Sequence, residues 1–393
     1  MYTSASNHRK IIGALVLFAV CSFGLVQVCL AQASTLPFSP ARWSGALLYL
    51  SGQGSRDPKT GRIPENFSAQ ARQSLENCRA LLKKEGLDLT HVVKANVYLT
   101  DIKNFAEMNG VYKTFFAKDP PARTTVALPA LPGGMQIEIT LVASKNQHRK
   151  PIYPDGQKPT PNDLYSPAIQ SGEMIFLSGQ GSRQYLTKEF PTGGFEGHVR
   201  QCLENLGQVL KAAGLGFEDV VRSDVYLTDI KTIGDMNKVY KTFFQTNPPV
   251  RTTVAVTALP GEPPIEITLL ATRSKSKKVV APPNAPSGMP FSPGIQLGDQ
   301  LYLAGKAGFS KEGFEAQLKE VLDGCLETLK AGGMDFSNVL EGKVYLANMQ
   351  DYEKLNAIYR TYFQGVFPAR TCVAISNLVA GSQIEITLLA RKK

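Results

Sequence analysis

Apolar and polar residues along this chain follow two periods, and the same order of periods returns three times. Helical spacing of apolar residues marks one face of a helix at Ala71, Leu75, Cys78 and Leu82, and again at Leu318, Leu322, Cys325 and Leu329. Short apolar runs at 46–51, 174–178 and 300–304 precede these helical segments and are typical of strands. Each unit therefore begins with strands and continues into an amphipathic helix.

The second half of each unit shows another strand, another helix and two closing strands. In the first unit a strand is expected around 97–99 and a helix from Asn104, with Glu107 at the spacing of a capping box. Closing strands are expected at 124–128 and 136–143, while Gly86, Gly214 and Gly332 are natural helix stops. This order predicts an α/β fold in which a mixed sheet carries two helices on one face of each domain.

The unit is repeated at the size of a whole domain. Arg123 returns 128 residues later as Arg251 and a further 119 residues later as Arg370. A period of about 120 residues is far above that of solenoid repeats and indicates three tandem domains. A sheet with helices on one face leaves its other face open, and three copies in one chain would bury those faces against one another. We therefore expect an intramolecular pseudo-trimer, monomeric in solution.

Changes in amino-acid composition along the chain indicate where the domains begin and end. The segments 145–163 and 274–287 are rich in proline, lysine and polar residues and are interpreted as exposed linkers. The predicted organisation is a signal peptide at 1–33, repeat one at 34–144, a linker at 145–163, repeat two at 164–273, a linker at 274–287 and repeat three at 288–393.

The first residues have the features of an export signal. A basic start (His8, Arg9, Lys10) precedes an apolar stretch at 11–30 and the sequence Ala31-Gln32-Ala33. This pattern predicts a secretory signal peptide cleaved after Ala33, and hence a periplasmic or secreted protein with no stable membrane partner. The alternative is an uncleaved membrane anchor, since about 20 apolar residues can span a bilayer.

Charge and metal-ligating residues narrow the chemistry. The formal net charge is +10, and loss of residues 1–33 removes Arg9 and Lys10 but no acid, which leaves +8. The basic residues are scattered, so we interpret them as a solvated surface and expect no nucleic-acid partner. The four histidines are dispersed and show no metal-ligand spacing, so no metal is expected.

Four cysteines follow the predicted signal, and their sequence positions allow three disulfide pairings. They are Cys78, Cys202, Cys325 and Cys372. The first three lie on apolar helix faces, which favours small buried hydrophobic side chains over disulfides.

One motif pair occurs in every repeat at fixed spacing. Pro121-Ala-Arg-Thr-Thr-Val126 is followed by Ile137-Glu-Ile139, and the arginine lies 15 positions before the glutamate. Repeats two and three carry the same pair around Arg251 with Glu266 and Arg370 with Glu385. The chain resembles the RidA/YjgF family of reactive-intermediate deaminases at these motifs and over essentially all of its predicted mature length.

The resemblance implies a trimeric arrangement with ligand clefts between neighbouring domains. It also implies a hydrolase acting on C=N bonds, of the 2-iminobutanoate/2-iminopropanoate deaminase type, which converts 2-imino or 2-enamino acids to 2-oxo acids and ammonia without cofactor or metal. Arg123, Arg251 or Arg370 would bind the substrate carboxylate, supported by the backbone N–H of Thr125, Thr253 or Cys372. Glu138, Glu266 or Glu385 would hold the attacking water.

The chemistry of these residue types agrees with that role. A guanidinium matches a carboxylate through two parallel hydrogen bonds and stays charged at any working pH. Two alternatives stay open. The arginine and glutamate could form a cross-strand ion pair within one sheet, or the clefts could belong to a non-catalytic binding protein for small carboxylates.

The repeats also depart from the family pattern. The family's deaminases carry a tyrosine just after a Gly-Pro pair, and the matching segments here are interpreted as Ser39-Pro40-Ala41, Ser166-Pro167-Ala168 and Ser292-Pro293-Gly294. On that alignment all three lack the tyrosine, which argues against efficient deamination. Repeats one and two keep a Ser-Gly-Gln loop, whereas repeat three has Ala304-Gly-Lys306 and a shorter segment after it.

Overall fold

The computed structural model describes residues 36–146, 149–160, 163–185 and 187–392. The predicted signal peptide at 1–33 lies outside this part of the chain. Within the described residues no helix is long and apolar enough to cross a membrane.

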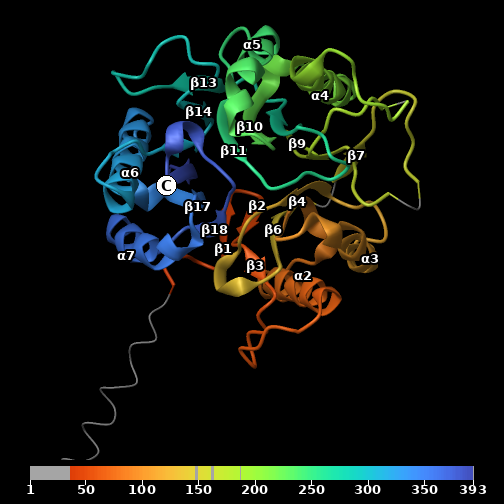
Figure 1. Ribbon diagram of the computed structural model, residues 1–393, viewed down its shortest axis with the longest axis horizontal. Helices are drawn as coiled ribbons and strands as arrows, with labels where there is room; N and C mark the ends of the chain where they lie inside the picture. Colours follow the sequence, from red (N-terminus) through yellow and green to blue (C-terminus); the bar gives the residue numbers. More distant parts are fainter. Residues whose placement is uncertain (1–35, 147–148, 161–162, 186, 393) are drawn as a thin grey trace, which may run out of the picture. The chain divides into compact units, whose positions relative to one another are not determined.

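Repeat one contains two long helices and a six-stranded mixed sheet (Figure 1). Its elements are β1 (Ala41–Ser44), β2 (Leu47–Leu50), β3 (Gln53–Gly54), α2 (Phe67–Lys84), β4 (Val92–Leu99), α3 (Phe105–Phe115), β5 (Ala122–Ala127) and β6 (Ile137–Ser144). The strand order is β1-β2-β6-β4-β5, with β3 also paired to β6. Only β4 and β5 run parallel, because α3 connects them as a crossover.

Repeats two and three follow the same order with an added edge strand at their start, and the short strand before the first helix is present in repeat three but not among the described strands of repeat two. Repeat two consists of β7 (Lys150–Ile152), β8 (Ala168–Ser171), β9 (Met174–Leu177), α4 (Gly194–Ala212), β10 (Val220–Leu227), α5 (Ile233–Phe243), β11 (Val250–Ala255) and β12 (Ile265–Thr272). Repeat three consists of β13 (Lys277–Val280), β14 (Gly294–Leu297), β15 (Gln300–Leu303), β16 (Lys306–Ala307), α6 (Phe314–Ala331), β17 (Val339–Leu346), α7 (Tyr352–Tyr362), β18 (Ala369–Ala374) and β19 (Ile384–Arg391). The predicted α/β class with three tandem domains is thus confirmed.

The helices of each repeat lie beside one another on its sheet. In repeat one α2 contacts α3 and β6. The predicted apolar face of α2 is buried there, with Leu75 and Leu82 almost fully inaccessible. Gly86, Gly214 and Gly333 end the first helix of each repeat with positive φ angles of 75°, 69° and 70°, a conformation that glycine adopts without steric cost.

Two local predictions need correction. Asn104 does not cap α3 through its side chain, because the chain already turns as a 3-10 helix at Ile102–Asn104, capped by Asp101. Glu107 instead accepts a hydrogen bond from Ser68 of α2.

The predicted linkers are also more than connectors, because each contributes an edge strand to the following sheet. The strand β7 pairs with β8, and β13 pairs with β14. Each of these strands buries one apolar residue, Ile152 or Val280, in the core of the repeat that follows it.

The open faces of the three sheets bury one another in two shared apolar clusters. One contains Tyr49, Phe176 and Tyr302, each from a different repeat. The other contains the recurring tyrosines Tyr98, Tyr226 and Tyr345 with apolar residues from all three repeats. These tyrosines are core residues, since each is at most 2% exposed.

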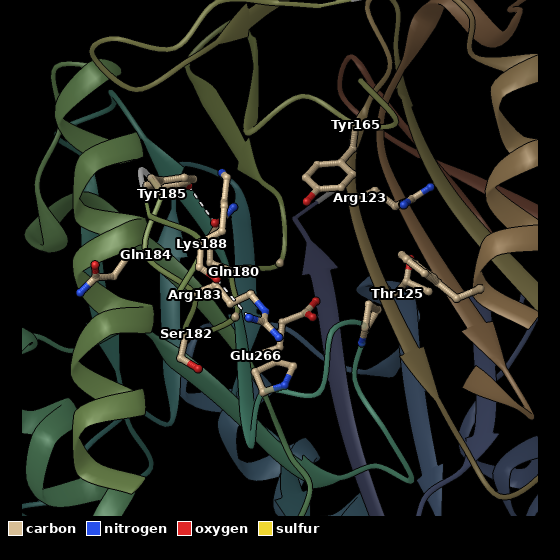
Figure 2. A pocket seen from close by; sticks show the side chains of 15 residues that line it. Arg123, Thr125, Tyr165, Gln180, Ser182, Arg183, Gln184, Tyr185, Lys188 and Glu266 are labelled. Atoms are coloured by element: carbon tan, nitrogen blue, oxygen red, sulfur yellow. Dashed lines mark hydrogen bonds between the residues drawn. The ribbon is translucent and has the colours of Figure 1, made fainter. Parts of the chain in front are cut away.

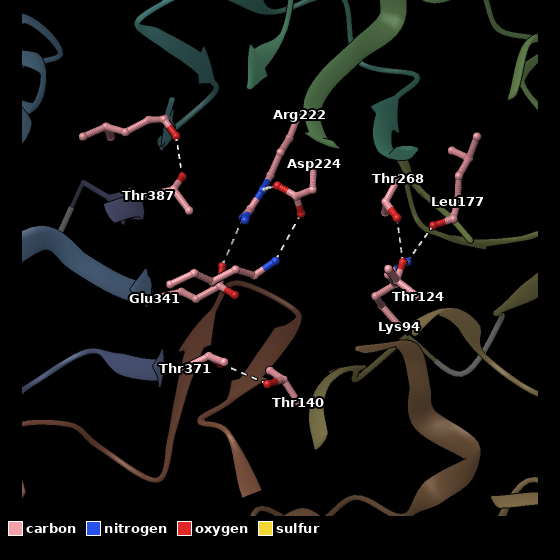
Figure 3. A network of polar contacts seen from close by, with 12 residues as sticks. Lys94, Thr124, Thr140, Leu177, Arg222, Asp224, Thr268, Glu341, Thr371 and Thr387 are labelled. Atoms are coloured by element: carbon pink, nitrogen blue, oxygen red, sulfur yellow. Dashed lines mark hydrogen bonds and ion pairs between the residues drawn. The ribbon is translucent and has the colours of Figure 1, made fainter. Parts of the chain in front are cut away.

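Buried polar residues lie between those two clusters along the same strands. On β4, Lys94 and Asn96 stand between Val93 of the first cluster and Tyr98 of the second. The equivalent positions are Arg222 and Asp224 on β10 and Glu341 and Lys343 on β17. We call these six residues the central polar network, of which Figure 3 labels Lys94, Arg222, Asp224 and Glu341.

Candidate functional site

The predicted arginine and glutamate of one repeat do not face each other. Arg123 lies on β5 and Glu138 on β6, and β4 runs between these two strands. The cross-strand ion pair that the sequence left open is therefore wrong. Strand order separates the two side chains within a sheet, although they are only 15 positions apart in the chain.

Each arginine instead meets the glutamate of a different repeat. Arg123 and Glu266 line one cavity, which we call site 1, and Arg251 and Glu385 line another, site 2. Arg370 acts electrostatically on Glu138, and this pair defines site 3. Figure 2 shows Arg123 and Thr125 on one side of site 1 and Glu266 on the other. The predicted substrate-binding and catalytic residues thus come together, but only across repeat boundaries.

A glycine holds the two halves of each site in register. The N–H of Gly179 donates to the backbone carbonyl of Arg123 at 3.0 Å. A Cβ atom on Gly179 would lie 1.9 Å from Oε1 of Glu266, so no other residue fits without displacing that carboxyl. The same arrangement joins Gly305 to Arg251 and Glu385, and Gly52 to Arg370 and Glu138.

A serine before that glycine fixes the arginine backbone in two of the three sites. The Ser178 hydroxyl accepts from the N–H of Arg123 at 2.8 Å and donates to the carbonyl of Ser166 at 2.6 Å. Ser51 makes the same pair of bonds at site 3, to Arg370 and Ser39. Repeat three has Ala304 at this position, so site 2 lacks this hydroxyl bridge.

The Arg123 guanidinium is buried among aromatic rings. Its Cζ atom lies 4.8 Å from the ring centre of Tyr112 and 5.2 Å from that of Tyr165. The side chain is only 3% exposed and its Nη1 atom has no hydrogen-bond partner. The Thr125 hydroxyl, which lines the same cavity, is also buried without a partner. Because buried polar groups are normally paired, these atoms indicate a place for an anionic ligand.

The other two arginines differ in their hydrogen bonds. Nη1 of Arg251 lies 3.9 Å from the Met236 sulfur, a weak acceptor. Nη2 of Arg370 donates to Asn356 at 2.7 Å and to the Tyr352 hydroxyl at 3.3 Å, while its Nη1 has no partner. The guanidinium of site 3 is thus partly satisfied within its own repeat.

Burial makes the three glutamates weak acids. It raises the pKa of Glu266 to about 7, against the opposing effect of Lys94 and Arg123. It raises the pKa of Glu138 and of Glu385 to about 8, again opposed by the facing arginine. At Glu385 the backbone N–H of Thr253 also donates to the carboxylate. Glutamates with pKa values near neutrality can exchange a proton with a substrate or a water.

The three repeats have Ala41, Ala168 and Gly294 where the family tyrosine is expected, and the aromatic ring over each arginine comes from another position. The residue directly before each Ser-Pro pair lies over the arginine of the site, and in repeat two this residue is Tyr165. Phe38 takes the same position over Arg370 at 5.1 Å, and Phe291 over Arg251 at 5.2 Å. The signal that could have found the position is an aromatic residue before Ser-Pro in every repeat.

The predicted binding residue Cys372 lies on β18 near the site 3 arginine and is buried as a free thiol. Burial raises the pKa of this thiol to about 12. Cys78, Cys202 and Cys325 are also free and buried, as the helix patterns predicted. Among the residues that the structure describes, no cluster of three His, Cys, Asp or Glu side chains could hold a metal ion.

Comparison with known proteins places all three repeats in one family. The family described as Endoribonuclease L-PSP matches residues 30–145, 156–273 and 282–392. The chain is 38% identical over 120 residues to the 2-iminobutanoate/2-iminopropanoate deaminase of Bos taurus, covering 30% of this chain and 88% of the relative. It is 40% identical over 116 residues to the protein of that name from Salmonella typhimurium, covering 29% and 91%.

A solved structure of a relative also aligns with about one repeat of this chain. The YjgF gene product of E. coli is 37% identical with a TM-score of 0.27, and the alignment covers 28% of this chain and 88% of that one. Each of these relatives thus matches about one repeat. The motif pairs, the three family matches and the three equivalent sheets make this chain a member of the RidA/YjgF family with three tandem copies of the family domain.

Proposed function

We propose that this protein hydrolyses small 2-imino acids and their 2-enamino tautomers to 2-oxo acids and ammonia at clefts between its repeats. One observation carries the proposal: in site 1 a buried guanidinium with an unpartnered N–H faces a glutamate whose pKa is about 7. The cavity there has about 250 Å³, which suits a small organic acid rather than a nucleic-acid strand. The names of two relatives, both 2-iminobutanoate/2-iminopropanoate deaminases, also support this reaction.

Each residue of site 1 has a defined task in this reaction. The Arg123 guanidinium binds the substrate carboxylate, with support from the backbone N–H of Thr125. A water molecule held by Glu266 attacks the imine carbon, and the glutamate accepts the proton that this water loses. The C–N bond then breaks, the nitrogen leaves as ammonia after gaining protons, and the oxygen stays on carbon as the new carbonyl. Positioning supplies most of the rate, because an imine is already an electrophile.

The alternative, a non-catalytic binding protein for small carboxylates, is favoured at sites 2 and 3 by one observation. Phe291 and Phe38 replace the phenol that Tyr165 brings to site 1. Site 1 is therefore our candidate for catalysis, whereas sites 2 and 3 retain the arginine and glutamate but lack the hydroxyl.

The test combines ammonia release with ligand binding. We expect the full chain to accelerate ammonia release from freshly generated 2-imino acids and to bind 2-oxo acids in titration calorimetry. Glu266→Gln should retain binding and lower the hydrolysis rate by about 100-fold, the usual contribution of a positioned base. The exposed Glu65→Gln is the matched control and should change neither. Binding without ammonia release would establish the alternative, and absence of both would overturn the proposal.

A single chain is also proposed to supply all three interfaces of a family trimer, as an intramolecular pseudo-trimer. The support comes from contacts at every boundary: Ser39 with Pro368, Ser166 with Pro121, and Ser292 with Pro249 are joined by backbone hydrogen bonds of 2.9 to 3.2 Å. Light scattering should report one chain per particle. Three chains per particle would contradict this arrangement.

Export is a further proposal and rests on the basic start, the apolar stretch and Ala31-Gln32-Ala33. We expect a periplasmic or secreted protein whose first residue is Ser34. N-terminal sequencing of the protein from the exported fraction checks this, and a sequence starting at Met1 would contradict cleavage.

A further inference from the structure

Sites 1 and 2 share their arginine, glutamate and glycine but have different walls. In repeat two, twelve residues separate Gly181 from the start of α4, and the side chains of Arg183, Tyr185 and Lys188 from this segment line site 1. In repeat three only six residues separate β16 from α6. The cavity at site 2 accordingly has about 720 Å³, against about 250 Å³ at site 1.

The walls of site 2 are largely apolar. Phe291 stacks over Arg251, and Met289 and Phe309 line the same cavity while staying 42% and 53% exposed to solvent. Val321 of α6 and Ile233 of α5 add further apolar surface. Exposed large apolar side chains that gather around a cavity mark a binding surface.

The most buried polar groups of site 2 are Arg251, Thr253 and Glu385, and the cavity is also lined by Lys306, Asp323 and Glu327. Arg251 and Glu385 are at most 5% exposed, and the Thr253 hydroxyl beside them is buried without a hydrogen-bond partner. Glu320, which also lines the cavity, is already engaged, because its carboxylate accepts from the N–H groups of Phe309 and Ser310 at 2.8 Å each. A ligand would thus meet an anion-binding end and an apolar opening.

We propose that site 2 binds 2-oxo and 2-imino acids with a large apolar side chain, aromatic or long aliphatic, whereas site 1 is restricted to small ones. The carboxylate lies on Arg251 and the side chain extends toward Phe291 and Phe309. This inference rests on the proposed function, since it uses the same arginine as carboxylate receptor.

The experiment compares phenylpyruvate with pyruvate by titration calorimetry on the full chain. Burial of a phenyl group should make phenylpyruvate bind site 2 at least about tenfold more tightly than pyruvate does. Arg251→Lys should weaken phenylpyruvate binding by about ten- to 100-fold. Phe309→Ser should lower the affinity for phenylpyruvate about tenfold more than that for pyruvate.

A matched control and distinct failures keep the test decisive. Val366→Ser removes another exposed apolar side chain, 68% accessible, that does not line site 2, and it should change neither affinity. Pyruvate binding that depends on the arginines, together with no preference for phenylpyruvate and no effect of Phe309→Ser, would overturn the inference alone. If neither acid responds to any Arg→Lys change, the carboxylate-binding role itself fails.

Discussion

The residues of the three sites and those of the central polar network lie on equivalent strands in every repeat. Their identities are conserved among the repeats to different degrees. Each site keeps the same arginine, glutamate and glycine. In the network the equivalent residues are Lys94, Arg222 and Glu341 at one position, and Asn96, Asp224 and Lys343 at the other. The arginine, glutamate and glycine of the sites recur, whereas the buried polar residues of the network have changed.

The changes in the network create opposite charges across one boundary. Arg222 of repeat two lies 3.6 Å from Glu341 of repeat three, and Lys343 lies 3.2 Å from Asp224 (Figure 3). Burial alone would raise the pKa of Asp224, but Arg222 and Lys343 hold it well below its usual range. Such cross-repeat pairs require that the two neighbours differ, which a single chain with three distinct repeats allows.

Repeat one shows what happens without such a partner. Lys94 donates to Thr124 and to the backbone carbonyl of Leu177, both at 2.8 Å, but among the described residues no carboxylate accepts from it. Burial, reinforced by Lys343, lowers the pKa of Lys94 to about 7. Three identical copies of repeat one would bring three such ammonium groups together. The network therefore depends on having three different repeats beside one another.

The largest predicted effect comes from a substitution that removes a charge from the central polar network. Asp224→Ala should lower the free energy of unfolding by about 3–5 kcal/mol, because it leaves two buried cations short of a counter-charge. Denaturant unfolding measures this change. The control is Asp299→Ala, which removes a surface partner of Arg391 and should cost less than about 1 kcal/mol. Equal costs for the two variants would show that the network contributes no more than a surface pair.

The next effect concerns a recurring residue. Arg123→Lys keeps the charge but loses the two-pronged geometry, and it should cost about 1.5–3 kcal/mol of 2-oxo acid binding at site 1, or roughly ten- to 100-fold in affinity. Titration calorimetry on single and triple arginine variants checks it. If the folded triple Arg→Lys variant binds as the unchanged protein does, the arginines are structural.

The pH dependence of binding should distinguish the sites. A bound carboxylate raises the pKa of the glutamate beside it, so binding takes up a proton at pH values between the pKa of the free site and the higher pKa of the occupied site. Affinity should therefore fall by up to about tenfold per pH unit above about 7 at site 1, where Glu266 has that pKa. At site 2 the fall should begin near 8, the pKa of Glu385.

Titrations with a 2-oxo acid across neutral pH measure this dependence. Glu266→Gln should abolish it at site 1 and leave site 2 unchanged. A dependence that persists in that variant would assign the proton to another group.

The smallest predicted effect comes from a substitution that makes repeat two more like repeat three. Ser178→Ala gives repeat two the residue that repeat three has at Ala304, and it removes the hydroxyl between Arg123 and Ser166. The expected cost is about 1 kcal/mol in denaturant unfolding, as for a typical hydrogen bond. No measurable loss would mean that the hydroxyl bridge does not stabilise the boundary.

The sequence predicted the repeated motif pair and the order of elements because both recur at fixed spacing. It could not tell which repeat supplies the glutamate to each arginine, since that depends on β4 lying between β5 and β6. The network was also missed. Lys94 and Asn96 alternate with apolar residues on β4, and this pattern is typical of a solvent-facing strand surface. Only contact with other repeats buries them.

The boundary between repeats one and three joins segments that lie far apart in the chain. The bond from Ser39 to Pro368 and that from Gly52 to Arg370 each close a loop of more than 300 residues. Contacts of such sequence separation carry the greatest entropic cost and form late in folding. We therefore expect site 3 to join the first and last repeats at a late stage of folding. Its Arg370–Glu138 pair would be assembled after the other two sites and would separate first when the chain begins to unfold.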